Sequence, residues 1–273
     1  MSRVVAHVRL IHPFPALTVS ATGFGIALVA APLQWDAALR ILAMILASQV
    51  AIGSFNEYCD APVDAIGQPW KPIPAGLLTR RDALVQATAG LVACLAIAAS
   101  FGAVTAAIAV AGCAIGGLYD SALKRTPWSW LPYVVDVPLL PIWAWSAAGV
   151  LTADLIWIYP VGGLLALSAH IANAIPDDAE DRSTGAHTIV QQLGMERALA
   201  LLRVSFLGAG LLGALTILPS HFSLPLLTIG AGAGAVGLVG VWLMGRADRR
   251  RLAFRLIALA AGLLAIGAAV AVR

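Results

Sequence analysis

Long apolar stretches follow one another along the chain, with short polar connections between them. Each stretch is close to the ~20 residues that a helix needs to cross the hydrocarbon core of a bilayer. The pattern predicts nine membrane-spanning helices that fill residues 1–273 as a single domain, without room for a soluble domain. The predicted spans lie near 14–33, 38–57, 82–100, 103–121, 129–150, 155–176, 196–217, 224–244 and 252–271.

The composition agrees with an all-helical membrane protein. Hydrophobic residues make up 60% of the chain and charged residues only 11%, whereas about 25% of an ordinary soluble domain is charged. So few polar side chains cannot cover a water-exposed surface, which excludes a soluble enzyme. Intrinsic disorder is also excluded, because disordered chains have low hydrophobicity.

Basic residues predict the orientation of the bundle. With nine spans, the N-terminus lies on the same side as the connections after the second, fourth, sixth and eighth spans. Of the 17 Lys and Arg residues, all but Arg40 and Arg273 fall on that side. Lys and Arg concentrate on the cytoplasmic side of membrane proteins. We therefore expect a cell-membrane protein with a cytoplasmic N-terminus, a C-terminus on the opposite side, and no nucleic-acid partner.

Two polar clusters on the predicted cytoplasmic side have the same spacing, N-x-x-x-D-x-x-x-D. Residues four apart lie on one face of a helix, so each copy is expected to present an amide and two carboxylates as one ladder. The first copy follows the second span and the other follows the sixth; they are Asn56, Asp60 and Asp64, and Asn173, Asp177 and Asp181.

Such ladders need positive partners, because neighbouring carboxylates repel each other. Mg²⁺ prefers oxygen ligands and commonly joins carboxylates to substrate phosphates. Two ladders on one side of the membrane predict two Mg²⁺ ions with a diphosphate between them. Basic side chains nearby are candidates for the remaining phosphate oxygens; they are Lys71, Lys124, Arg125 and Arg182. The alternative, solvated loop charges, is disfavoured by the repeated spacing.

The chain resembles the UbiA-type intramembrane prenyltransferases over essentially its full length. The resemblance rests on NEYCDAPVD at 56–64 with KPIPAG at 71–76, on YDSALKR at 119–125, and on IPDDAEDRSTGAHTIVQQLG at 175–194. It implies a nine-helix bundle around a central cavity, with the active site beneath cytoplasmic cap loops. It also implies Mg²⁺-dependent transfer of a prenyl group from an isoprenyl diphosphate to a small lipophilic acceptor, either an aromatic compound or another lipid-pathway molecule.

The resemblance implies roles for individual positions. Asp60, Asp64, Asp177 and Asp181 match the metal ligands of the family. The other assignments are catalytic for Lys71, Tyr119, Lys124, Arg125 and Asp136, and substrate-binding for Asn56, Asn173, Arg182, His170 and Trp143.

The sequence departs from the family pattern at three places. Glu57 replaces a common Asp, and Ala179 with Glu180 replaces a common Glu-Gly pair. The direct ligands among Asp177, Asp178, Glu180 and Asp181 therefore stay open. Tyr119 and Lys124 are five residues apart where four is usual.

The implied chemistry is ionisation of the allylic C–O bond, with metal and basic side chains stabilising the departing diphosphate. Aromatic side chains favour a nearby cation, and Asp136 and His170, buried in spans, are candidates to contact the acceptor or a proton. The aromatic candidates near the fifth span are Trp128, Trp130, Tyr133, Trp143 and Trp145, of which the first two also fit ordinary interfacial packing.

Two other functions stay open at this point. A UbiA-type terpene cyclase would ionise the same diphosphate and quench the cation within its own chain. A membrane transporter would use the carboxylates as a cation site, although transport sites lie near the membrane midplane and both ladders lie on one side.

Overall fold

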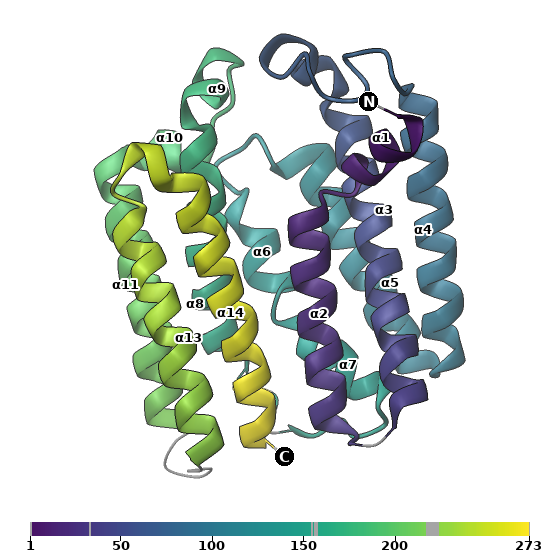
Figure 1. The fold of residues 1–273 in the computed structure, drawn as a ribbon, viewed down its shortest axis with the longest axis vertical. Coiled ribbons are helices and arrows are strands. Elements are labelled where there is room, and N and C mark those ends of the chain that lie inside the picture. The colour runs from purple at the N-terminus through teal and green to yellow at the C-terminus, as the bar shows by residue number, and fades with distance from the viewer. Residues whose placement is uncertain (1, 33, 154, 156–157, 217–223, 273) are drawn as a thin grey trace.

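The computed structural model describes residues 2–32, 34–153, 155, 158–216 and 224–272, and every regular element in these ranges is a helix (Figure 1). The predicted span ends at 33 and 217, and Arg273, lie outside the described residues. The helices of the N-terminal half are α1 (Arg3–Leu10), α2 (Pro13–Ala30), α3 (Trp35–Gly67), α4 (Arg80–Ser100), α5 (Ala103–Leu118), α6 (Trp130–Asp136) and α7 (Leu139–Ala147). Those of the C-terminal half are α8 (Ile158–Ala174), α9 (Asp178–Ser183), α10 (Ile189–Leu193), α11 (Met195–Thr216), α13 (Leu224–Leu243) and α14 (Arg250–Val272).

The described residues contain 8 helices that are long and apolar enough to cross a membrane. They correspond to all of the predicted spans except 129–150. That segment forms the shorter helices α6 and α7, which meet at Val137 and Pro138. The expectation of nine unbroken spans is therefore not confirmed, although the helical membrane bundle is. Proline removes a helical N–H and crowds the preceding turn, which explains a break between Pro132 and Pro141.

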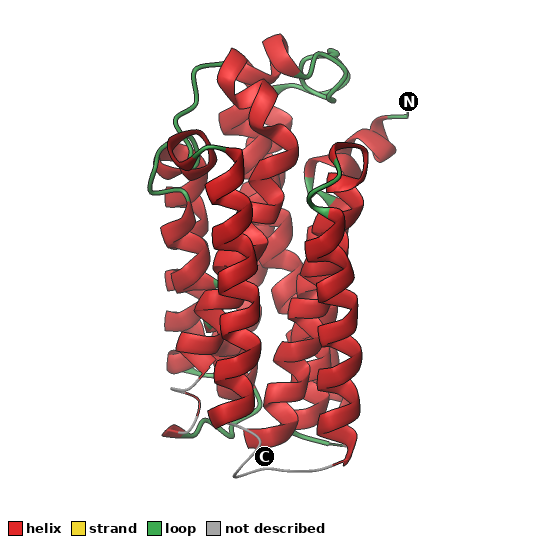
Figure 2. Cartoon of the chain, turned by 90° about the vertical axis from the view of Figure 1, so that its left-hand side faces the viewer, coloured by secondary structure: helices red, strands yellow, loops and turns green. Residues whose placement is uncertain are grey.

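The helices pack as two groups. Ile26, Met44, Ile45 and Trp143 belong to one buried apolar cluster, which joins α2, α3 and α7 with parts of α4 and α5. A second cluster joins α8, α11, α13 and α14. Helix α14 packs against both α2 and α8, and so connects the groups. In two views at right angles the long helices run side by side along the longest axis (Figures 1 and 2).

The connections that carry the polar motifs gather at one end of the bundle. Helices α9 and α10 and the segment after α3 lie at the end that holds the N-terminus, and the C-terminus lies at the other end (Figure 1). Helix α3 has 33 residues, or roughly 50 Å at 1.5 Å per residue, against a hydrocarbon core of ~30 Å. It therefore extends beyond one bilayer crossing and carries the first motif at its end.

Candidate active site

A cavity of about 1120 Å³ opens between the two groups of helices. All of the predicted site residues line it except Arg182, whose side chain is exposed and pairs with Asp178 at 3.2 Å. The fold therefore brings together residues from four separate parts of the chain. They are Asn56, Asp60, Asp64, Lys71, Tyr119, Lys124, Arg125, Asp136, Trp143, His170, Asn173, Asp177 and Asp181.

The first ladder lies on one continuous helix, as its spacing predicts. Helix α3 continues through Gly67 and contains Pro62. A proline cannot donate to the carbonyl four residues before it, which here is that of Tyr58. Arg80 replaces the missing donor, because its Nε donates to the Tyr58 carbonyl at 3.1 Å while its guanidinium stacks 4.3 Å from the Tyr58 ring. Arg80 thus supports the motif-bearing end of α3.

The second ladder differs from the expected single helix. Helix α8 ends at Ala174, a 3-10 turn covers Ile175–Asp177, and α9 begins at Asp178. The change coincides with Pro176, which lies in the first turn of the 3-10 segment, where the missing N–H of proline leaves no helical carbonyl unpaired. Pro62, by contrast, is accommodated inside α3. Despite the break, Asn173, Asp177 and Asp181 all line the cavity.

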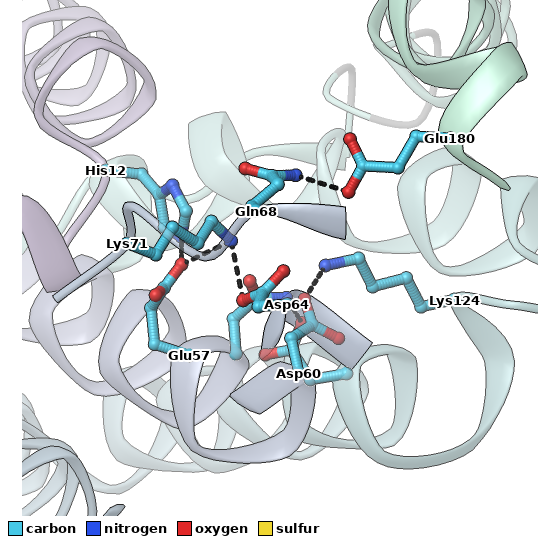
Figure 3. A network of polar contacts seen from close by, with 10 residues as sticks. His12, Glu57, Asp60, Asp64, Gln68, Lys71, Lys124 and Glu180 are labelled. Atoms are coloured by element: carbon cyan, nitrogen blue, oxygen red, sulfur yellow. Dashed lines mark hydrogen bonds and ion pairs between the residues drawn. The ribbon is translucent and has the colours of Figure 1, made fainter. Parts of the chain in front are cut away.

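Lysine side chains neutralise the first ladder. Lys71 Nζ lies 2.8 Å from Asp64 Oδ2 and 2.9 Å from Glu57 Oε1, and Lys124 pairs with Asp60 (Figure 3). Burial lowers the pKa of Lys71, but Glu57 and Asp64 outweigh burial, so its net pKa is raised. The pKa of Lys124 is likewise raised, because Asp60 outweighs the effect of burial. Both ammonium groups therefore stay charged at neutral pH.

Hydrogen bonds join the two sides of the cavity mouth. Gln68 Nε2, just beyond α3, donates to Glu180 Oε1 on α9 at 2.9 Å (Figure 3). Arg125 Nη2 donates to the Thr184 carbonyl at 2.5 Å. Arg251, which also lines the cavity, lies 3.1 Å from Asp177. The segments after α3, α5 and α9 thus form one connected cap over the charged residues.

Aromatic rings lie directly below this charged layer. Tyr119 and Tyr133 meet edge to face at 5.4 Å, and Tyr133 lies 4.6 Å from the His170 ring. His170 Nε2 is 3.1 Å from the Ser129 hydroxyl. Of the predicted tryptophans, Trp143 lines the cavity, whereas Trp128 is 58% exposed and lies outside it.

Several site residues were missed by sequence reasoning. Glu57 is buried between Lys71 and His12, and Asp120 accepts a hydrogen bond from Asn56 Nδ2 at 2.7 Å. Both acids belong to motif segments, so their positions carried a signal. His12 and Gln68 carried none, because their partners lie far away in the sequence.

The donor set fits Mg²⁺ by its chemistry. Within the described part of the chain, no three carboxylate, imidazole or thiol side chains converge as a formed metal site, since Asp60 and Asp64 face lysines instead. The ladder residues nevertheless offer only amide and carboxylate oxygens, the ligands that Mg²⁺ prefers. They lie on the two sides of one cavity mouth, which suits ions held together with a bridging phosphate.

Known proteins resemble this chain over most of its length. The model of the UbiA prenyltransferase family matches residues 17–263. A digeranylgeranylglyceryl phosphate synthase of Korarchaeum cryptofilum is 31% identical, over 82% of this chain and 79% of its own. The same enzyme of Methanopyrus kandleri is 28% identical, over 77% and 80%.

Solved structures share the fold. A UbiA homologue from Archaeoglobus fulgidus covers 100% of both chains with a TM-score of 0.76 at 21% identity. The same homologue bound to GPP and Mg²⁺ matches with a TM-score of 0.73 at 22% identity, over 98% of this chain and 100% of that chain. The family match over nearly all of the chain, on a helical bundle with the expected cavity, establishes that this protein belongs to the UbiA prenyltransferase family.

Proposed function

We propose that this enzyme transfers a prenyl group from an isoprenyl diphosphate to a small lipophilic acceptor within the bilayer, using two Mg²⁺ ions. The observation that carries the proposal is a cavity with two facing carboxylate ladders and two lysines at its mouth and aromatic rings beneath them. The relatives are named digeranylgeranylglyceryl phosphate synthases, and GPP and Mg²⁺ are bound in the Archaeoglobus fulgidus homologue.

The proposed reaction divides the cavity into two zones. Bound Mg²⁺ would supply charge stabilisation to the diphosphate oxygens, held by Asp60, Asp64, Asp177 and Asp181. Lys71, Lys124 and Arg125 line the same mouth and are suited to hold the oxygens that the ions leave free. The allylic C–O bond breaks with its electron pair on the diphosphate.

The cation left on the prenyl chain then meets the aromatic layer. The faces of Tyr119 and Tyr133 favour positive charge, and the apolar cavity excludes water that would quench it. An acceptor oxygen or carbon forms the new bond and releases a proton.

We further propose that the active site faces the cytoplasm of a cell-membrane protein. The support is the concentration of Lys and Arg at the motif-bearing end, which predicts a cytoplasmic side. The N-terminus lies at this end and the C-terminus at the other (Figure 1).

Product analysis tests the proposal. Purified protein in detergent or lipid vesicles is incubated with geranyl or geranylgeranyl diphosphate, Mg²⁺ and a panel of acceptors, including isoprenoid glyceryl phosphates and phenols. We expect acceptor-dependent release of diphosphate, a prenylated product by mass spectrometry, and complete loss of turnover with EDTA that excess Mg²⁺ restores. A hydrocarbon or terpene alcohol formed without acceptor would instead identify a cyclase, and diphosphate release in EDTA would contradict the metal assignment.

Asp136 is the proposed base for the acceptor proton. It lies on α6 about one helical turn beyond Tyr133, lines the cavity, and forms no hydrogen bond or ion pair among the described residues. A carboxylate inside a membrane segment is usually functional. We expect Asp136→Asn to lower kcat by ~100-fold, the scale of general-base catalysis, with little change in the KM for the prenyl diphosphate. Steady-state kinetics measure both constants; an unchanged kcat would remove Asp136 from the reaction.

A further inference from the structure

Glu57 belongs to the first acidic motif but lies apart from the cavity. Its side chain is 2% exposed and does not line the cavity, whereas Asn56, Asp60 and Asp64 do. Glu57 lies on nearly the same helix face as Asp64, about two turns before it. The side chains of Lys71 and His12, which contact the Glu57 carboxylate, do line the cavity, so Glu57 lies behind them.

The partners of Glu57 are two basic side chains. Lys71 Nζ lies 2.9 Å and His12 Nε2 lies 3.1 Å from the same oxygen, Oε1 (Figure 3). A buried carboxylate is costly unless a positive or hydrogen-bonding group compensates it. The arrangement therefore ties together the turn before α2, the motif helix α3 and the segment after α3.

The backbone at His12 is built to make this contact. His12 has a φ of 50° and is the one non-glycine residue with a positive φ in the described ranges. Such a conformation is costly for a non-glycine residue and concentrates at functional sites. The turn at Ile11 and His12 also packs closely against α3. A Cβ added to Gly53, one helical turn before Glu57, would lie 2.9 Å from the Ile11 Cα.

Lys71 therefore has two carboxylate partners of different kinds. Asp64 lines the cavity and is a proposed metal ligand, so its oxygens are needed elsewhere once substrate is bound. Glu57 does not line the cavity, so a metal bound there would leave its contact with Lys71 in place. Without Glu57, the ammonium would retain only Asp64 and would compete with the metal for it.

We propose that Glu57, held by His12, is a positioning residue that keeps the Lys71 ammonium at the cavity wall to bind the diphosphate. This inference rests on the proposed function, because it assumes that the mouth binds a diphosphate. In this proposal Glu57 acts by holding the Lys71 side chain in place and does not bind the metal itself.

A double-mutant cycle tests the inference with inorganic pyrophosphate as the probe. Binding is measured by isothermal titration calorimetry at saturating Mg²⁺, without prenyl donor or acceptor. We expect Glu57→Gln to weaken pyrophosphate binding about tenfold or more, because the substitution removes the buried negative charge that pairs with the Lys71 ammonium. In a Lys71→Gln background the same substitution is expected to change binding less than twofold, because the residue through which it acts is gone.

Two further variants check the folding and the geometry. Glu57→Asp keeps the carboxylate and is expected to restore most of the affinity that Glu57→Gln loses. His12→Asn keeps a residue type that tolerates positive φ and is expected to weaken binding in the same direction. Thermal melts of each variant identify a loss of fold. If Glu57→Gln does not fold, His12→Asn is measured in both backgrounds in its place.

Binding of Mn²⁺ alone, followed by its EPR signal, separates positioning from metal ligation. Lys71→Gln and Glu57→Gln/Lys71→Gln proteins are expected to bind Mn²⁺ within twofold of each other. Weaker Mn²⁺ binding in the double variant would show that Glu57 is a metal ligand. Equal losses of pyrophosphate affinity in both backgrounds would show that Glu57 does not act through Lys71. Either result overturns the inference. Failure of the proposed transferase activity would appear separately, as an absent prenylated product.

Discussion

Alanine at Asp60 or at Asp177 is expected to abolish prenyl transfer, lowering kcat/KM by about a thousandfold or more for either variant. The two residues lie on opposite sides of the cavity mouth, on α3 and at the end of the turn after α8. Neither ladder alone can enclose ions and a diphosphate. Each substitution removes an oxygen ligand on one side, so the loss at one side is not compensated by the other.

The measurement is Mg²⁺-dependent release of diphosphate from the prenyl donor, with the melting temperature of each purified variant recorded beside it. Asp60→Asn is included because it preserves shape next to Lys124. Asp248→Ala is the matched control, since Asp248 is an exposed carboxylate paired with Arg249 away from the cavity; its activity is expected to equal that of the wild type. Full activity in a folded Asp60 or Asp177 variant would refute the metal clamp.

Alanine at Gly90 is expected to destabilise the whole bundle. Gly90 lies on α4 where this helix packs on α3. An added Cβ would lie 2.7 Å from the Ala51 backbone nitrogen and 2.9 Å from the Ala47 carbonyl oxygen. Backbone atoms cannot turn aside as a side chain does, so α4 must move away from α3. Overpacking of this kind costs about 1–3 kcal/mol.

Gly117→Ala on α5 provides the control, because no atom lies within 4 Å of its added Cβ. Alanine favours a helix over glycine by up to ~1 kcal/mol, so this variant is expected to match or slightly exceed the wild type. The denaturation midpoint in detergent compares the three proteins. Equal midpoints for Gly90→Ala and the wild type would show that close α3–α4 packing does not limit stability.

The course of the backbone could be predicted where hydrophobicity alone decides it. The stretches at 82–100 and 224–244 became α4 and α13 with nearly the expected ends. Apolar length does not show how far a helix continues into polar sequence, and α3 extends ten residues beyond its predicted end at 57. The break within the apolar run at 129–150 could not be predicted either. Prolines are tolerated within some membrane helices, so the prolines of this run did not show that the helix would be interrupted.

For the candidate site, too, some features could be predicted from local sequence and others could not. The repeated spacing, on one predicted side of the membrane, predicted that the two ladders would act together, and Asp60 and Asp177 both line the cavity. It could not predict that Asn56 donates to Asp120 or that Lys71 bridges Glu57 and Asp64. Those contacts depend on how separate helices approach one another, which no local pattern records. Arg182 matched by position, yet the turn of α9 directs its side chain to the surface.

The pairing of lysines with aspartates at the cavity mouth has a consequence for ligand entry. Each lysine already contacts at least one carboxylate, and these ions are largely shielded from water. A ligand of mixed sign, such as a diphosphate with its divalent cations, can take over these contacts, with its phosphate oxygens facing the lysines and its cations facing the aspartates. No lysine or aspartate of these pairs then loses its partner of opposite charge without gaining another, a loss that would be costly for partly buried ions.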